Sequence, residues 1–178
     1  MEDSFAPSKR KTENRSFRID SGTLTGLEEE ASRKKVSVNT LVNQLLADYI
    51  DVGRHRKRLG TVSLSVSAFE HVLAAASDED ITRAGRVSGH SVPKAYALSK
   101  WGVESVPNVL SFIRENASVT SLYDYSESPQ SPKTITLTHS FGKKWSLYLS
   151  SFFIAAFDDA GQKVVSEISD QVVGLKLI

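Results

Sequence analysis

The chain has 178 residues, of which 40% are apolar and 24% charged, as is typical of soluble globular proteins with one or two domains. Because it contains no cysteine, disulfide frameworks, thiolate zinc sites and cysteine nucleophiles are excluded. The net charge of +1 divides unevenly: residues 1–60 carry 12 Lys and Arg against 9 Asp and Glu, and residues 61–178 carry 10 against 12. This asymmetry favours a basic nucleic-acid-binding module joined to a larger, mildly acidic domain.

Neither a secretory signal nor a membrane span is expected. The first residues lack a long apolar stretch, and no apolar run approaches the roughly 18 residues that cross a bilayer. We therefore expect a cytoplasmic protein without a membrane partner.

A short strand is predicted after a polar arm. Residues 1–13 are polar and basic, which indicates a flexible arm that is either simply solvated or attracted to phosphates. Apolar Phe17 and Ile19 then alternate with Ser16 and Arg18, the period-two pattern of a strand with one apolar face. A strand this short, even with the two helices that follow, is too small to bury a core. We expect it to pair with the same strand of a second chain.

Two closely spaced helices are predicted next. In the first, Leu24 and Leu27 recur at helical spacing, and in the second a wide apolar stripe runs along residues 41–50. Ser37 has the hydroxyl of an N-cap for the second helix, and Gly53 is expected to end it. The predicted dimer core consists of Phe17, Ile19, Leu24, Leu27, Leu41, Val42, Leu45, Leu46 and Tyr49.

The predicted ribbon presents polar side chains to DNA. A B-DNA major groove admits a two-stranded ribbon whose outward side chains meet base edges. With Phe17 and Ile19 turned inward, the outward residues are Asn14, Ser16 and Arg18. Arginine suits guanine and asparagine suits adenine through paired hydrogen bonds, whereas serine is permissive.

Residues 14–50 resemble the ribbon-helix-helix family of transcriptional regulators, whose β-ribbons read double-stranded DNA. The resemblance rests on the alternating strand, on the spacing in the first helix, and on the turn from Val36 to Leu41. It implies that Asn14, Ser16 and Arg18 occupy the base-reading positions of the family.

The start of the second helix is the predicted phosphate anchor, because its first amide groups are unpaired and lie at the positive end of the helix dipole. Ser37, Val38 and Asn39 stand there, and the resemblance implies that they bind the DNA backbone. Lys35 replaces the glycine frequent at this turn of the family, and is itself a predicted phosphate contact. Arg15 also departs from the family, in which an apolar residue is common at that position.

A second domain is predicted beyond a basic linker. The ribbon-helix-helix domain is placed at 14–53, and residues 54–60 form a linker that is either solvated or adds phosphate contacts. Residues 61–178 predict an α+β fold with a mostly antiparallel sheet and helices on one face. The expected strands lie near 62–66, 119–125, 134–139 and 172–177, and the expected helices near 68–76, 81–101, 109–115 and 143–160. Two glycines and a proline are expected to interrupt the helix at 81–101.

The most distinctive segment of this domain is 139–146. A strand ends at His139, and a helix begins with Lys143 and Lys144, whose charges oppose the dipole at a helix N-terminus. The segment is therefore either a site for an anionic ligand, a DNA phosphate or a partner subunit, or a solvated turn anchored by Trp145.

Metal and catalytic sites are not predicted. No two of the four histidines have the i, i+4 spacing of a helical metal site, so neither a metal nor a cofactor is expected. The acidic clusters at 78–80 and 158–159 indicate charge at helix ends rather than paired acid and base groups. Without a phosphate-binding glycine loop or a nucleophile elbow, an enzyme is not expected.

The sequence thus predicts a homodimeric or tetrameric transcriptional regulator, such as a repressor, that reads the major groove. Its second domain would mediate oligomerisation, or sense a small-molecule effector or a protein partner. The alternatives are an antitoxin, whose toxin-binding segment is often short and disordered when free, and an architectural DNA-coating protein with little sequence preference. Regular apolar patterning in residues 61–178 favours the regulator over the antitoxin.

Overall fold

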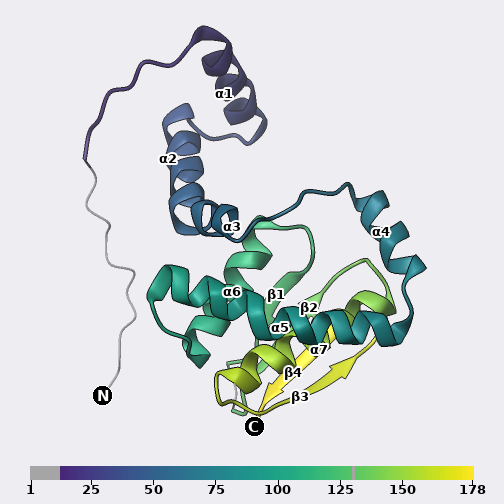
Figure 1. The fold of residues 1–178 in the computed structure, drawn as a ribbon. Helices are drawn as coiled ribbons and strands as arrows, with labels where there is room; N and C mark the ends of the chain where they lie inside the picture. Colours follow the sequence, from purple (N-terminus) through teal and green to yellow (C-terminus); the bar gives the residue numbers. More distant parts are fainter. Residues whose placement is uncertain (1–12, 130) are drawn as a thin grey trace. The chain divides into compact units, whose positions relative to one another are not determined.

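A computed structural model describes residues 13–129 and 131–178, which belong to two compact units, Met1–Leu46 and Ala47–Ile178 (Figure 1). The predicted arm at 1–13 lies outside the described residues except for its last position. In the first unit an extended stretch, 13–20, leads into helix α1 (Ser21–Arg33), and helix α2 (Val38–Asp48) follows after a short turn. The stretch at 15–19 forms no strand within the described chain, because a strand needs a hydrogen-bonded neighbour. Pairing with a second chain stays a prediction.

The second helix does not end at Gly53. It continues through a π-helical turn, η1 (Tyr49–Gly53), into the short helix α3 (Arg54–Arg58), and Gly53 itself has helical angles of φ −57° and ψ −46°. Glycine is only weakly unfavourable inside a helix, so tertiary packing overrides it. The predicted linker at 54–60 is therefore largely helical, and the compact units divide after Leu46 rather than after residue 53.

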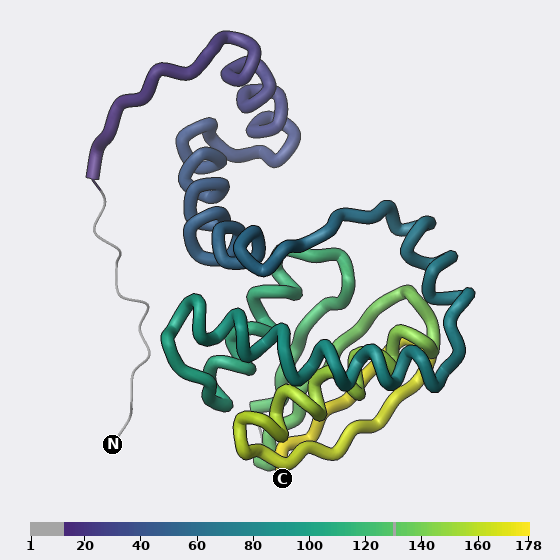
Figure 2. Tube along the Cα trace, viewed as in Figure 1, coloured from purple at the N-terminus to yellow at the C-terminus, as the bar shows by residue number. Residues whose placement is uncertain are grey.

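The second unit is an α+β fold, as predicted. Its remaining elements are α4 (Val66–Ala75), α5 (Asp78–Trp101), α6 (Val106–Val119), β1 (Asp124–Glu127), β2 (Thr134–Thr138), α7 (Lys143–Asp159), β3 (Val164–Ile168) and β4 (Val172–Leu177). The strands pair antiparallel in the order β1-β2-β4-β3. The tube trace shows α5 and α7 running alongside one another (Figure 2).

The core lies between the helices and one face of the sheet. Ile135 pairs with Leu175 and Leu137 with Val173 across β2 and β4, and all four side chains are fully buried. The threonines that alternate with them on β2 turn to the opposite face, as the two-residue period of a strand requires. From the helices, aromatic and aliphatic side chains of α5, α6 and α7 join the same cluster.

Three predicted elements differ from the structure. Residues 61–65 form no strand, because Ser65 instead caps α4 by accepting the Ala68 N–H at 3.3 Å. The strand expected at 119–125 is shifted, since α6 runs on to Val119 and β1 begins only at Asp124. Strand β3 was not predicted, because Ser166 and Glu167 interrupt its apolar alternation.

Helix α5 is continuous where an interruption was expected. Gly85 and Gly89 face α7 one turn apart, and a Cβ at Gly89 would lie only 2.2 Å from the Phe152 carbonyl oxygen. At Gly85 the corresponding distance to the Tyr148 carbonyl oxygen would be 2.6 Å. The glycines therefore allow two helix backbones to approach closely, and packing offsets their low helix propensity. Among the described helices, none has the length and apolarity needed to cross a membrane.

Candidate functional site

The turn between α1 and α2 is fixed by two backbone hydrogen bonds. The Val36 N–H donates to the Ala31 carbonyl at 3.0 Å, and the Lys35 N–H donates to the Ser32 carbonyl at 3.1 Å, which together make a Schellman C-cap. Lys35 has a left-handed backbone with φ 55°, a conformation that costs a residue other than glycine roughly 1–2 kcal/mol. The tight turn thus forms although lysine replaces the glycine that such turns favour.

The N-terminus of α2 presents unpaired amide groups. Ser37 caps the helix, since its Oγ accepts the Thr40 N–H at 3.0 Å. The N–H groups of Val38 and Asn39 have no acceptor within the described part of the chain. These amides lie at the positive end of the α2 dipole, where an anion such as a phosphate group is favoured, and Lys35 in the preceding turn is exposed.

The three predicted base-reading residues lie in the extended stretch before α1. Asn14, Ser16 and Arg18 are all exposed, and so are the alternating apolar residues, with 73% of the Phe17 side chain accessible. Within this stretch Arg15 forms a surface ion pair with Glu13 at 3.2 Å. The single chain places the predicted readers close together in sequence but does not itself assemble them into a ribbon.

The predicted dimer core is buried only in part by one chain. Leu41 is 1% exposed, and Leu27 and Val42 are half-buried. Its remaining members are exposed large apolar residues: Phe17, Ile19, Leu24, Leu45, Leu46 and Tyr49. Residues 17–49 therefore leave much of their apolar surface uncovered by the single chain.

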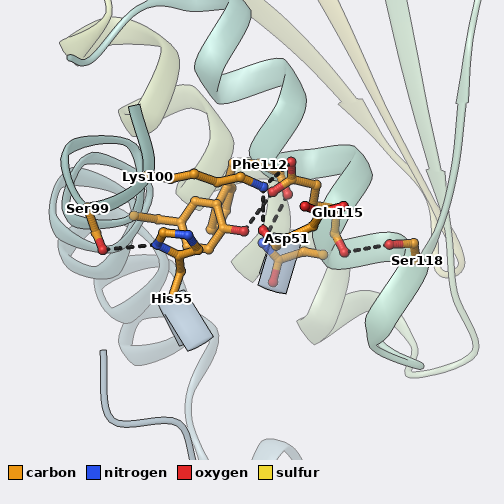
Figure 3. A network of polar contacts seen from close by, with 9 residues as sticks. Asp51, His55, Ser99, Lys100, Phe112, Glu115 and Ser118 are labelled. Atoms are coloured by element: carbon orange, nitrogen blue, oxygen red, sulfur yellow. Dashed lines mark hydrogen bonds and ion pairs between the residues drawn. The ribbon is translucent and has the colours of Figure 1, made fainter. Parts of the chain in front are cut away.

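Within the second unit, a polar network joins η1 and α3 to α5 and α6 (Figure 3). Lys100 of α5 donates to Glu115 Oε1 of α6 at 2.6 Å and to the carbonyl of Asp51 in the π-helical turn. The Tyr96 hydroxyl donates to Glu115 Oε2 at 2.6 Å. A π-helical turn shifts the backbone hydrogen bonds of a helix, and here the Asp51 carbonyl accepts from a side chain.

Burial and charge stabilise this network, which we call a clamp because it holds η1 and α3 against α5 and α6. Burial, reinforced by the Glu115 carboxylate, raises the pKa of Tyr96, so its hydroxyl stays a hydrogen-bond donor. His55 is buried beside the Tyr96 ring, and its Nδ1 lies 3.2 Å from Ser99 Oγ. The pKa of His55 is lowered mainly by burial and then by the neighbouring cations Arg54 and Lys100. This network was not predicted from the sequence. Its only sign there is His55, which lies within the run of Arg and Lys residues at 54–58.

The segment at 139–146 has internal partners for two of its three predicted ligand-binding residues. The Phe141 N–H donates to His139 Nδ1 at 3.2 Å, which leaves Nε2 protonated to donate to Ser146 Oγ at 2.9 Å. Lys144 donates to the carbonyls of Ala74 and Ala76 at the end of α4, the former at 2.9 Å. This contact explains a lysine at the start of a helix, because it stabilises the C-terminus of another. Lys143 is exposed, and a ligand role for the segment stays a prediction.

Lowering the pH below about 6.5 is expected to destabilise the second unit. Burial lowers the pKa of both His139 and His55 in the folded chain. The unfolded chain therefore takes up these protons first as the pH falls, so the stability present above pH 6.5 is progressively lost. Urea melts followed by circular dichroism at pH 7, 6 and 5 measure this. His139→Gln should flatten the dependence, whereas His71→Gln, at an exposed histidine on α4, should not.

Metal ligands are not gathered in the described part of the chain. Across residues 13–129 and 131–178, no group of three or more His, Asp or Glu side chains is arranged to hold a metal ion.

Comparisons with family models, with characterised proteins and with solved structures find no match to the chain.

Proposed function

We propose that this protein is a dimeric, sequence-specific DNA-binding regulator whose paired N-terminal strands read the major groove. The observation that carries the proposal is the uncovered apolar surface of residues 17–50 beside an extended, polar–apolar alternating stretch. The proposal accounts for both with one partner, a second copy of the chain.

The exposed apolar side chains support a symmetric partner. About half of Leu45 is accessible (49%), and Leu46 on α2 and Tyr49 at the start of η1 are similarly exposed. Fully burying a large apolar side chain contributes about 1.5–3 kcal/mol, so a few such residues stabilise a dimer substantially. Pairing the 15–19 segments of two copies would also satisfy strand hydrogen bonds that one chain leaves unmade.

The distribution of polar groups supports DNA as the ligand. Pairing with Phe17 and Ile19 turned inward leaves Arg18 and Asn14 on the outer face of the ribbon, where their side chains match guanine and adenine edges. The unpaired amides at the start of α2, with Lys35, supply backbone contacts that set the register of the ribbon on DNA.

The second unit favours a regulator over an antitoxin. It has its own sheet and a buried core, rather than the short segment that an antitoxin commonly folds onto a toxin. An architectural DNA-coating role would use the same N-terminal surface and is distinguished by its lack of sequence preference.

Arg18→Ala is expected to weaken binding to the specific DNA site by about 5- to 150-fold, because a bidentate arginine–guanine contact contributes roughly 1–3 kcal/mol. Binding to scrambled DNA should change far less. Fluorescence anisotropy on both duplexes measures the two affinities, with circular dichroism confirming the fold. The matched control is Arg83→Ala, which removes the same charge from α5 in the second unit. Unchanged selectivity in Arg18→Ala would rule out this residue as a base reader.

A further inference from the structure

An aromatic cavity, open to solvent on one side, lies at the edge of the core of the second unit. It has a volume of about 140 Å³ and lies between α5, α6, α7 and the segment that leads into β1. Its lining is dominated by six aromatic side chains: Phe112, Tyr123, Trp145, Tyr148, Phe152 and Phe153. The cavity is open to solvent on one side, and it exposes aromatic rings whose residues are otherwise largely buried.

The rings of α7 form a stacked wall along this cavity. The Trp145 and Tyr148 rings are 4.6 Å apart between centroids and nearly parallel at 8°. Tyr148 stacks in turn on Phe152 at 5.7 Å, and Phe152 stacks on Phe112 of α6 at 6.2 Å. Offset stacking and edge contacts are the preferred arrangements between aromatic rings, so another flat ring fits the chemistry of this wall.

Three polar groups around the cavity donate to backbone carbonyls. The Trp145 indole N–H donates to the Leu122 carbonyl at 2.9 Å, and the Tyr123 hydroxyl donates to the Ile113 carbonyl at 3.2 Å. Asn116 donates its amide to the Phe112 carbonyl at 2.9 Å. No charged side chain lines the cavity. A charged ligand would thus lose its hydration without gaining a counter-charge, and an uncharged one is favoured.

Size and access fit a single ring. An enclosed apolar cavity of about 150 Å³ binds benzene, and the cavity here has a similar volume but is open to solvent on one side. The cavity communicates with solvent beside Val92 of α5, whose side chain is 39% exposed although it lines the cavity. Asn116 and Leu122, also in the lining, are half-buried.

We propose that this cavity is a binding site for a small, uncharged molecule with one aromatic ring. The cavity is built entirely from residues 92–153 of the second unit, so the inference is independent of DNA binding. It gives the second domain a defined ligand chemistry: a flat ring inserted against the stacked wall of α7.

Calorimetric titration of the full chain with toluene and phenol tests the site. Saturable binding of about one molecule per chain is expected, with benzoate binding much more weakly because of its charge. Val92→Phe, which fills the opening, should weaken toluene binding about tenfold or more. Val87→Phe adds the same ring at an exposed position of the same helix and should leave binding unchanged.

The proposal is overturned if neither toluene nor phenol binds saturably, if benzoate binds as well as toluene, or if Val92→Phe folds and binds like the wild type. If Val92→Phe does not fold, the site is tested instead by NMR, from the chemical shifts of methyl groups in the wild-type chain. Toluene should then shift the methyl signals of Val92, Leu122 and Leu149, and shifts confined to other regions would contradict the assigned site.

Discussion

Leu45→Ala is expected to lower the free energy of unfolding by about 2–5 kcal/mol, the cost of truncating a buried leucine. In a single chain this side chain is 49% exposed, and an exposed substitution usually changes stability by less than about 0.5 kcal/mol. The large effect arises only if a second copy covers residue 45. Thermal melts followed by circular dichroism at two protein concentrations measure it, since the stability of a dimer rises with concentration.

Two matched variants serve as controls for the effect of Leu45→Ala. Leu98→Ala removes a leucine of the same 49% exposure from α5, and a small effect is expected there. Leu41→Ala removes a leucine that is buried within one chain, so it should be costly whether or not a dimer forms. If Leu45→Ala behaved like Leu98→Ala, with melts independent of concentration, the apolar surface of α2 would not be a dimer core.

Gly89→Ala is expected to destabilise the second unit by about 3 kcal/mol or more, at the upper end of the cost of overpacking. The added Cβ would lie 2.2 Å from the Phe152 carbonyl oxygen and 2.9 Å from the Ala155 Cβ. The first of these neighbours is backbone, which cannot rotate away, so α5 and α7 must separate. Urea denaturation of the purified variant gives the change in unfolding free energy.

Gly26→Ala is the matched control for this substitution. Gly26 also lies inside a helix, α1, but a Cβ there would meet nothing within 4 Å. Alanine should therefore stabilise α1 by up to about 1 kcal/mol through its higher helix propensity. Equal effects of the two substitutions would mean that the close approach of α5 and α7 does not depend on Gly89.

Periodicity was sufficient to predict the elements that have one clearly buried face. The alternation of Ile135 and Leu137 with threonines predicted β2, and the apolar helix after Gly142 was placed with nearly its observed bounds. The same pattern failed at residues 62–66, because alternation alone does not supply a neighbouring strand. Gly85 and Gly89 were misjudged for a related reason: propensity is local, whereas their role depends on the backbone of a distant helix.

The candidate sites likewise differ in whether a local sequence pattern could indicate them. The proposed base readers and phosphate anchors, such as Arg18 and Ser37, lie within one short segment, so local pattern and family resemblance could suggest them. The clamp between Lys100 and Glu115 and the cavity beside Trp145 join residues far apart in the sequence, and no periodicity indicates them. His139 and Lys144 stood out in the sequence, yet their observed partners are Ser146 and the end of α4.

The most direct measurement is fluorescence anisotropy of the purified protein on labelled DNA from upstream of its own gene, with a scrambled duplex as reference, across a salt series. We expect selective binding to the first duplex, with two chains per site and an affinity that falls as salt rises. Equal affinity for both duplexes with a steep salt dependence would contradict sequence-specific reading and indicate an architectural role. Absence of binding to either duplex would contradict DNA as the partner of the N-terminal segment.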